Sequence, residues 1–172
     1  YRIKGQVTVG MVAYIKEIVD NFKPHDPTTS IASTPATKHL FRSVDDSPNL
    51  SEDKLTIFHH FVAKCLFATK CSRPDNAIAV VYLTTHVKSP DENDWKRLVW
   101  LICYLHGTIL LSLTLQANSL IFPKWWVDGL HGVHLNMRGQ MSGCLTLGQG
   151  AIIGISTKQK NKLKKFDRNR NH

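Results

Sequence analysis

The sequence predicts an α+β fold in which a helical region comes first and a series of β-strands follows. Apolar residues recur with helical spacing as far as Gly107, and from Leu111 onward they alternate with polar ones. Hydrophobic residues make up 42% of the chain and charged residues 20%, which excludes collagen-like and wholly disordered proteins. The 172 residues suit one domain, or one small domain with part of another.

The first helix is predicted from Val9 to Phe22, where apolar residues fall on one face before Pro24 ends the pattern. Residues 24–50 hold four prolines and many small polar residues, and they are predicted to form an extended linker without a core of its own. A second helix follows Ser51, a residue type that favours the N-cap. Its predicted buried face consists of Leu55, Phe58, Val62, Cys65, Leu66 and Thr69.

The third helix begins after the break at residues 72–75. Its predicted inner face consists of Ile78, Val81, Tyr82 and Thr85. The fourth helix has a start signal, with Ser89 as N-cap, Pro90 at the first position and Glu92 three residues after the cap. Gly107 ends this helix, and its predicted buried residues are Trp95, Leu98, Leu101, Ile102 and Leu105.

Strands are predicted at residues 111–115 and 120–128, and residues 141–157 form two more around a turn at 148–150. One alternative concerns residues 98–115, which contain no charged side chain over 18 residues and could be a single membrane-spanning helix. Gly107 and the change of hydrophobic period inside this segment favour the soluble interpretation.

Most of the net charge of +9 lies in the last fifteen residues, which hold seven basic side chains and one acidic one. The basic residues are Lys158, Lys160, Lys162, Lys164, Lys165, Arg168 and Arg170. The rest of the chain is nearly neutral, so the charge describes a tail and not a basic fold. Such a tail could bind the phosphate backbone of nucleic acids without sequence preference.

The four cysteines form no CxxC pair, and no apolar leader follows Tyr1. We therefore predict reduced core thiols and an intracellular protein, in the cytoplasm or nucleus, without a signal peptide. His131 and His134 have the spacing of a metal-binding pair, with Cys144 ten residues on. A fourth ligand is missing, so zinc is not predicted.

Asp128 is the candidate functional residue. It is the only acidic residue between Asp94 and Asp167, and it follows the apolar residues 125–127. A carboxylate at the end of a buried strand costs free energy unless it is hydrogen-bonded or binds a cation. The residues alone leave open whether Asp128 is a metal ligand or a turn residue that faces solvent.

Five strings occur in one order: FHHFVAKCLFATKCSRPD (58–75), VVYLTTHVKSPDENDWKRL (80–98), CYLHGT (103–108), KWWVDGLHGVHLNMRG (124–139) and TLGQGAIIGISTKQK (146–160). Together they resemble the Pol polyprotein of copia-type LTR retrotransposons. The resemblance begins near residue 5, continues through Lys160 and covers most of the chain.

This resemblance implies that residues 1–110 are the C-terminal thumb and connection of a reverse transcriptase. Residues 111–160 would be the N-terminal part of a ribonuclease H-like domain, an incomplete mixed β-sheet with flanking helices. The family copies RNA into DNA, inside virus-like particles, and cleaves the RNA strand of RNA–DNA hybrids with two Mg²⁺ ions held by carboxylates. Asp128, in WWVD, matches the first of these carboxylates. The resemblance therefore implies that Asp128 is a metal ligand and a catalytic residue.

The chain also departs from the family. The paired polymerase aspartates lie upstream in the family and are absent, so we predict no DNA synthesis. Residues 138–143 keep only Arg138 and one glycine of the family's Arg-Ser-His-Thr-Gly-Gly. Residues 161–172 replace the Lys-Ser-Ser-Thr-Glu-Ala-Glu stretch that supplies a catalytic Glu.

Residues 164–171 can be encoded so that reading one nucleotide later gives Lys-Ser-Ser-Thr-Glu-Thr-Glu, which predicts a frameshift near residues 160–164. Our hypothesis is therefore that the chain is a truncated Pol fragment without activity of its own. We expect it to bind neither Mg²⁺ nor a small-molecule substrate, and not to associate with a membrane. Its nucleic-acid partners would be those of the family. Nonspecific nucleic-acid binding through a genuine basic tail is the alternative.

The incomplete sheet should leave Leu113, Leu115, Trp125 and Val127 partly uncovered.

Overall fold

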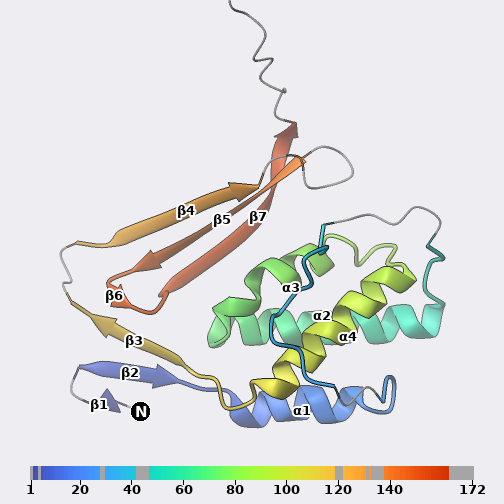
Figure 1. Ribbon diagram of the computed structural model, residues 1–172, viewed down its shortest axis with the longest axis horizontal. Helices are drawn as coiled ribbons and strands as arrows, with labels where there is room; N and C mark the ends of the chain where they lie inside the picture. Colours follow the sequence, from blue (N-terminus) through green and yellow to red (C-terminus); the bar gives the residue numbers. More distant parts are fainter. Residues whose placement is uncertain are drawn as a thin grey trace, which may run out of the picture.

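The structure is a computed structural model, and it describes residues 2–3, 5–27, 30–41, 47–118, 122–130, 132 and 138–162. A group of helices lies on one side of the molecule, and two small antiparallel sheets lie beside it (Figure 1). The α+β class is confirmed, with helices followed by strands. The exception is a pair of short strands that precede the first helix, which the sequence analysis did not predict.

The helical region contains α1 (Val12–Phe22), α2 (Glu52–Cys71), the short 3₁₀ helix η1 (Pro74–Asn76), α3 (Ala77–Thr84) and α4 (Glu92–Gly107). All four predicted helices exist. The first begins three residues later than predicted, because Val9 belongs to a strand that pairs with the segment after α4. Tertiary pairing decides the conformation of this short segment.

The core lies among α1, α2, α3 and α4. Phe22 of α1 packs edge-on against Phe61, at 4.8 Å between ring centroids, and tilted against Trp95 at 5.6 Å. The predicted buried face of α4 is confirmed. The predicted face of α3 is right only at Tyr82, because Ile78 and Thr85 are exposed while Ala79, Val80 and Leu83 are buried.

The face predicted for α2 is right at Phe58, Val62, Cys65 and Thr69, and the structure adds Phe61 and Ala68. Within the predicted linker, residues 30–41 and 47–50 form no helix or strand, apart from an isolated bridge between Asn49 and Asp91. This segment is nevertheless attached to the core, because Leu40 is buried in the main apolar cluster. In the residues that the structure describes, this segment thus has no helix or strand, as expected of a linker, but it packs on the core more closely than a linker would.

The helix starts show one correct and one wrong cap. Ser51 caps α2, and its hydroxyl accepts a bond from the Lys54 amide. Asp91, not Ser89, caps α4, because the Asp91 carboxylate accepts from the Asp94 amide and the Asp94 carboxylate accepts from the Asp91 amide. This reciprocal pair is a capping box two residues later than the predicted one.

One sheet has the order β1-β2-β3-β6, formed by β1 (Arg2–Ile3), β2 (Gln6–Val9), β3 (Leu113–Ala117) and β6 (Gly148–Gln149). The other has the order β4-β5-β7, formed by β4 (Lys124–Leu130), β5 (Arg138–Thr146) and β7 (Ile153–Lys162). Every pair among these described strands is antiparallel, so the predicted mixed sheet is not observed in this part of the chain.

The predicted hairpin within residues 141–157 is confirmed, since β5 pairs with β7. Its connecting residues also pair elsewhere, because Gly148 and Gln149 form β6 against β3. Gly150 has a φ of 80°, a left-handed conformation that glycine adopts without strain. The strand β7 passes beside α3 (Figure 1). Gly154 of β7 lies against Pro74 of the neighbouring η1.

Residues 98–115 do not form one helix, because α4 ends at Gly107 and β3 begins at Leu113. Of the helices that the structure describes, none has the length and apolar character needed to cross a membrane. The membrane-spanning alternative for this segment is therefore wrong.

Candidate functional site

Asp128 lies within β4, opposite Ser142 of β5, and Ser142 lies opposite Ser156 of β7. All seven residues of β4 are exposed, so the carboxylate sits on an open strand. Its Oδ1 accepts a hydrogen bond from the amide of the next residue, Gly129, at 2.8 Å. Asp128 therefore stands on the predicted strand, but not at a buried strand end.

A cavity of about 470 Å³ opens beside this carboxylate, between the β4-β5-β7 sheet and the start of α3. The sheet contributes one carboxylate, two hydroxyls and one thiol to it, and the helical side is apolar. The lining includes Asp128, Ser142, Ser156, Cys144, Pro74 and Ile78. The walls suit an apolar group with a few hydrogen bonds more than a highly charged ligand.

The residues present do not fit a two-metal centre. Among the described residues no three His, Cys, Asp or Glu side chains come together as a group that could hold a metal ion. His131 and His134 lie outside the described residues. Two Mg²⁺ ions need several carboxylate oxygens, and Asp128 supplies one exposed carboxylate.

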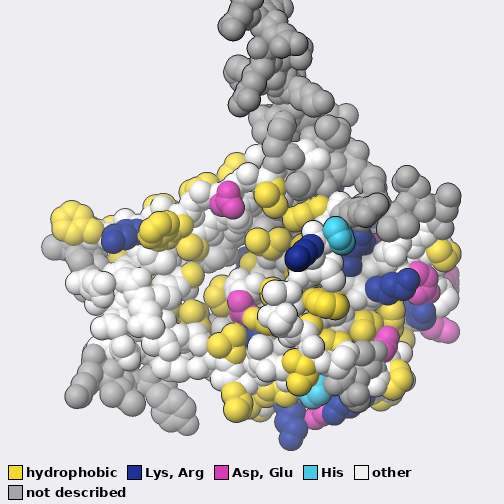
Figure 2. All heavy atoms as spheres, in the orientation of Figure 1, with side chains coloured by type: hydrophobic (Ala, Val, Ile, Leu, Met, Phe, Trp, Pro, Cys, Tyr) yellow, Lys and Arg dark blue, Asp and Glu magenta, His cyan; other side chains and the backbone are white. Residues whose placement is uncertain are grey.

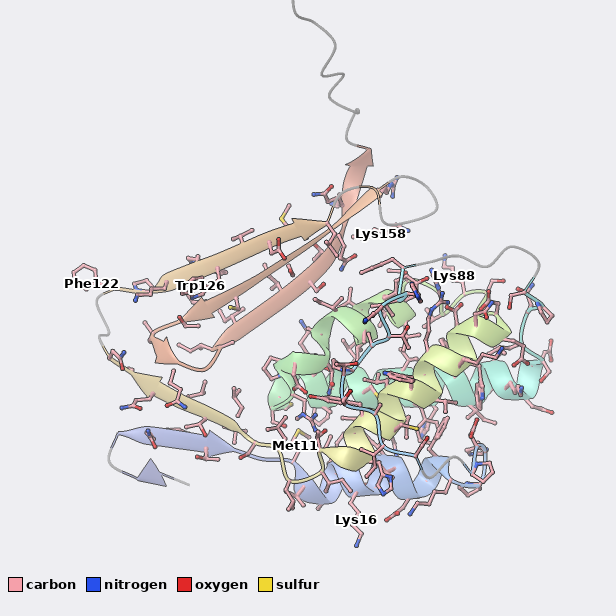
Figure 3. All side chains as sticks on the ribbon, in the orientation of Figure 1. Met11, Lys16, Lys88, Phe122, Trp126 and Lys158 are labelled. Atoms are coloured by element: carbon pink, nitrogen blue, oxygen red, sulfur yellow. The ribbon has the colours of Figure 1, made fainter. Side chains whose placement is uncertain are left out.

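A separate group of cations lies where β5 and β7 meet. Burial lowers the pKa of Lys158, and the neighbouring Arg138 lowers it further. The Arg138 Nε is buried and has no hydrogen-bond partner. Lys160 is exposed on the same strand as Lys158 (labelled in Figure 3). No carboxylate within the described residues forms an ion pair with these three side chains.

The rest of the predicted basic tail cannot be placed on this surface. Lys162 is the last residue of β7, and its side chain is not described. Lys164, Lys165, Arg168 and Arg170 lie outside the described residues. The structure therefore brings together Lys158 with Arg138, a residue that the charge count did not single out.

The prediction of four core thiols is half correct. Cys65 and Cys103 are buried, whereas Cys71 is exposed and Cys144 is half-buried. Burial raises the pKa of Cys65 to about 12, so its thiol stays protonated. All four cysteines are free.

Two polar clusters in the helical region were not predicted from the sequence. Arg73 is buried, and its guanidinium donates hydrogen bonds to the carboxylate of Asp75 and the backbone oxygen of Thr108. The carboxylate of Asp94 binds both His86 and Arg97. The Arg-x-Asp spacing of the first cluster could have suggested a local ion pair, but its contact with Thr108 is long-range and leaves no local pattern.

Comparisons with known proteins extend over both the helices and the sheets. A Retrovirus-related Pol polyprotein from transposon TNT 1-94 of Nicotiana tabacum is 28% identical over 163 residues, covering 92% of this chain and 12% of the relative. A putative transposon Ty5-1 protein of Saccharomyces cerevisiae is 24% identical over 157 residues, covering 90% of this chain and 49% of the relative.

This chain resembles retrotransposon Pol polyproteins. The resemblance that the five strings predicted, over most of the chain, is thereby confirmed. The chain spans less than half the length of either relative named above. No protein-family model matches it, and no solved structure matches it significantly.

Proposed function

We propose that the chain is a fragment of a Pol reverse transcriptase and ribonuclease H, and that it is inactive by itself. In this proposal residues 1–110 come from the end of the reverse transcriptase and residues 111–160 from the first strands of the ribonuclease H. The similarity to Pol relatives across helices and strands supports this assignment. Among the described residues, Asp128 belongs to no group of carboxylates that could hold a metal ion, and this observation supports the inactivity and carries the proposal.

Asp128 remains in the proposed position of a family carboxylate. Its strand is one of three antiparallel neighbours, which provides a rigid mount for a metal ligand. In-line cleavage of a phosphodiester by two metals needs several oxygen ligands around both ions. One carboxylate that already accepts the Gly129 amide cannot supply them.

The test is a cleavage assay. Purified chain is incubated with a labelled RNA–DNA hybrid and Mg²⁺, with an intact ribonuclease H as positive control. We expect no cleavage above the buffer blank. Cleavage by the wild-type chain that disappears in Asp128→Asn would overturn the proposed inactivity. Cleavage that persists in this variant would indicate a contaminating nuclease, which further purification should remove.

The cations of β5 and β7 favour a second function, nonspecific binding of nucleic-acid backbones. Arg138 and Lys158 repel each other, and no carboxylate in the described part of the chain forms an ion pair with either, so a bound phosphate would relieve the repulsion. Lys160 lies two residues further along β7 and adds a charge.

Replacing both Lys158 and Lys160 with glutamate should weaken binding to a fluorescent RNA–DNA hybrid. The slope of log K against log salt should become shallower by roughly 2 when two phosphate contacts are lost. The matched control replaces Lys16 and Lys96, exposed lysines on α1 and α4, with glutamate. Equal weakening in both double variants would show that binding depends on net charge and not on this surface.

A further inference from the structure

The strand β4 forms one edge of the three-stranded sheet, and within the described residues it pairs only with β5 (Figure 1). Its central residues carry large apolar side chains that are mostly exposed, 56% at Trp125, 61% at Trp126 and 70% at Val127. An open strand edge with such side chains is a template for another strand.

In residues 122–130, positions at equal distances before and after Trp126 carry matching residue types, either both apolar or oppositely charged. A lysine lies two positions before Trp126 and an aspartate two positions after it. Apolar residues lie four positions away on both sides, Phe122 at 72% exposure and Leu130 at 42%. Figure 2 shows this order along β4, with hydrophobic side chains on both sides of a basic one and an acidic one further along.

A strand with this symmetry can pair with a copy of itself. A two-fold axis perpendicular to the sheet keeps each side chain on its own face, so a residue can oppose only a residue of the same face. With the axis at Trp126, Lys124 opposes Asp128 of the second copy, and this pair occurs twice. The two Trp126 side chains oppose each other, and Phe122 opposes the second copy's Leu130.

Neighbouring registers lack this complementarity. An axis at Val127 would set Lys124 against leucine and Asp128 against tryptophan. An axis at Trp125 would set Lys124 against tryptophan and leave Asp128 without a basic partner. Cross-strand pairs of opposite charge and of apolar side chains stabilise a sheet, so the register at Trp126 is favoured.

The face of the sheet opposite to the one that carries Lys124, Trp126 and Asp128 adds an apolar surface. Val127 lies across from Gly143 and Ile155, and Trp125 lies across from Leu145 and Ile153. In the paired arrangement Val127 opposes Trp125 of the second copy. The two rows then join into one continuous apolar band across both copies, which extends the contact beyond the two edge strands.

We propose that two copies of the chain associate through antiparallel β4 strands, with Trp126 at the two-fold axis, and so join two three-stranded sheets into one. Charge complementarity between Lys124 and Asp128 selects a second copy as the occupant of this edge. The partner is therefore the chain itself, and the association needs neither catalysis nor nucleic acid.

Sedimentation over a concentration series, with the full chain and without nucleic acid, tests the proposal. The wild-type chain should form a dimer. Asp128→Lys sets lysine against lysine at both ends and should raise the dimer dissociation constant by one to two orders of magnitude, roughly. Lys124→Asp should do the same with two acidic pairs. The double variant Lys124→Asp with Asp128→Lys exchanges the charges and should restore dimerisation.

Lys16→Glu on α1 is the control for net charge and should leave the dimer unchanged. Circular dichroism verifies that each variant is folded, which is expected because both substituted positions are exposed. A wild-type chain that stays monomeric, or a double variant that associates no better than the single ones, would overturn the proposal. Larger assemblies that Asp128→Lys does not disperse would overturn it as well.

Discussion

Asp75→Ala is expected to lower the free energy of unfolding by about 3 kcal/mol, because it leaves a buried guanidinium without its counter-charge. The side chain of Arg73 is 1% exposed, and its Nη2 lies 2.8 Å from the Asp75 Oδ2. The same carboxylate oxygen accepts the hydroxyl of Tyr104 at 2.9 Å. Since 29% of the Asp75 side chain is exposed, water can reach part of the vacated site, which keeps the loss moderate.

Urea unfolding measures this loss, and a spectroscopic titration gives a second readout. Burial raises the pKa of Tyr104, and the hydrogen bond to Asp75 raises it further. The tyrosine pKa should therefore fall in Asp75→Ala. Asp20→Ala breaks an exposed ion pair with Lys23 and should change stability little. If both variants unfold at the same urea concentration, the Arg73 cluster is not a stabilising element.

Asp94→Ala is the second large effect, with an expected loss of about 3 kcal/mol from one helix cap and two charged hydrogen bonds. The Asp94 Oδ1 lies 2.8 Å from the His86 Nδ1 and 2.9 Å from the Arg97 Nη1. Its Oδ2 accepts the Asp91 amide at 3.2 Å. The substitution removes all three contacts and the capping box of α4 together.

The same residue gives stability a pH dependence. Burial acts to raise the pKa of Asp94, but the bond and charge of His86, the Asp91 amide and Arg97 together lower it below the ordinary 3.8. Because the folded pKa is the lower one, the contribution is complete above 3.8 and is lost as pH falls through the folded pKa.

Asp94→Asn should reduce the loss of stability at acidic pH, because the amide side chain does not titrate. Urea unfolding of the wild-type chain and of Asp94→Asn on both sides of pH 3.8 checks the expectation. Asp53→Asn, an exposed acid in the first turn of α2, is the control. If Asp94→Asn loses as much stability at acidic pH as the wild-type chain, the pH dependence comes from other carboxylates.

The helices were predictable because their signal is local. Periodicity located α2 and α4, and Ser51 marked the start of one of them correctly. The start of α4 was ambiguous because Ser89 with Glu92 and Asp91 with Asp94 both have capping-box spacing. Contacts of Asp94 with His86 and Arg97 favour the second pair, and these contacts are tertiary.

The remaining errors share a physical origin. The segment Ala77–Thr84 is apolar on nearly every side, so periodicity could not identify its inner face. The partner of the strand Gln6–Val9 follows the whole helical region in the sequence, and no local pattern reveals such a distant pair. Asp128 was correctly placed on a strand, but its exposure depends on which strands flank β4.

The pairing of β2 with β3 also determines the order in which the molecule can form. Val9 and Leu113 are direct partners, although the whole helical region lies between them. Closing so long a loop costs entropy, which the helices offset once they have packed. During synthesis β2 leaves the ribosome long before β3 and waits unpaired. The helical region can therefore begin to pack before the partner of β2 has been synthesised.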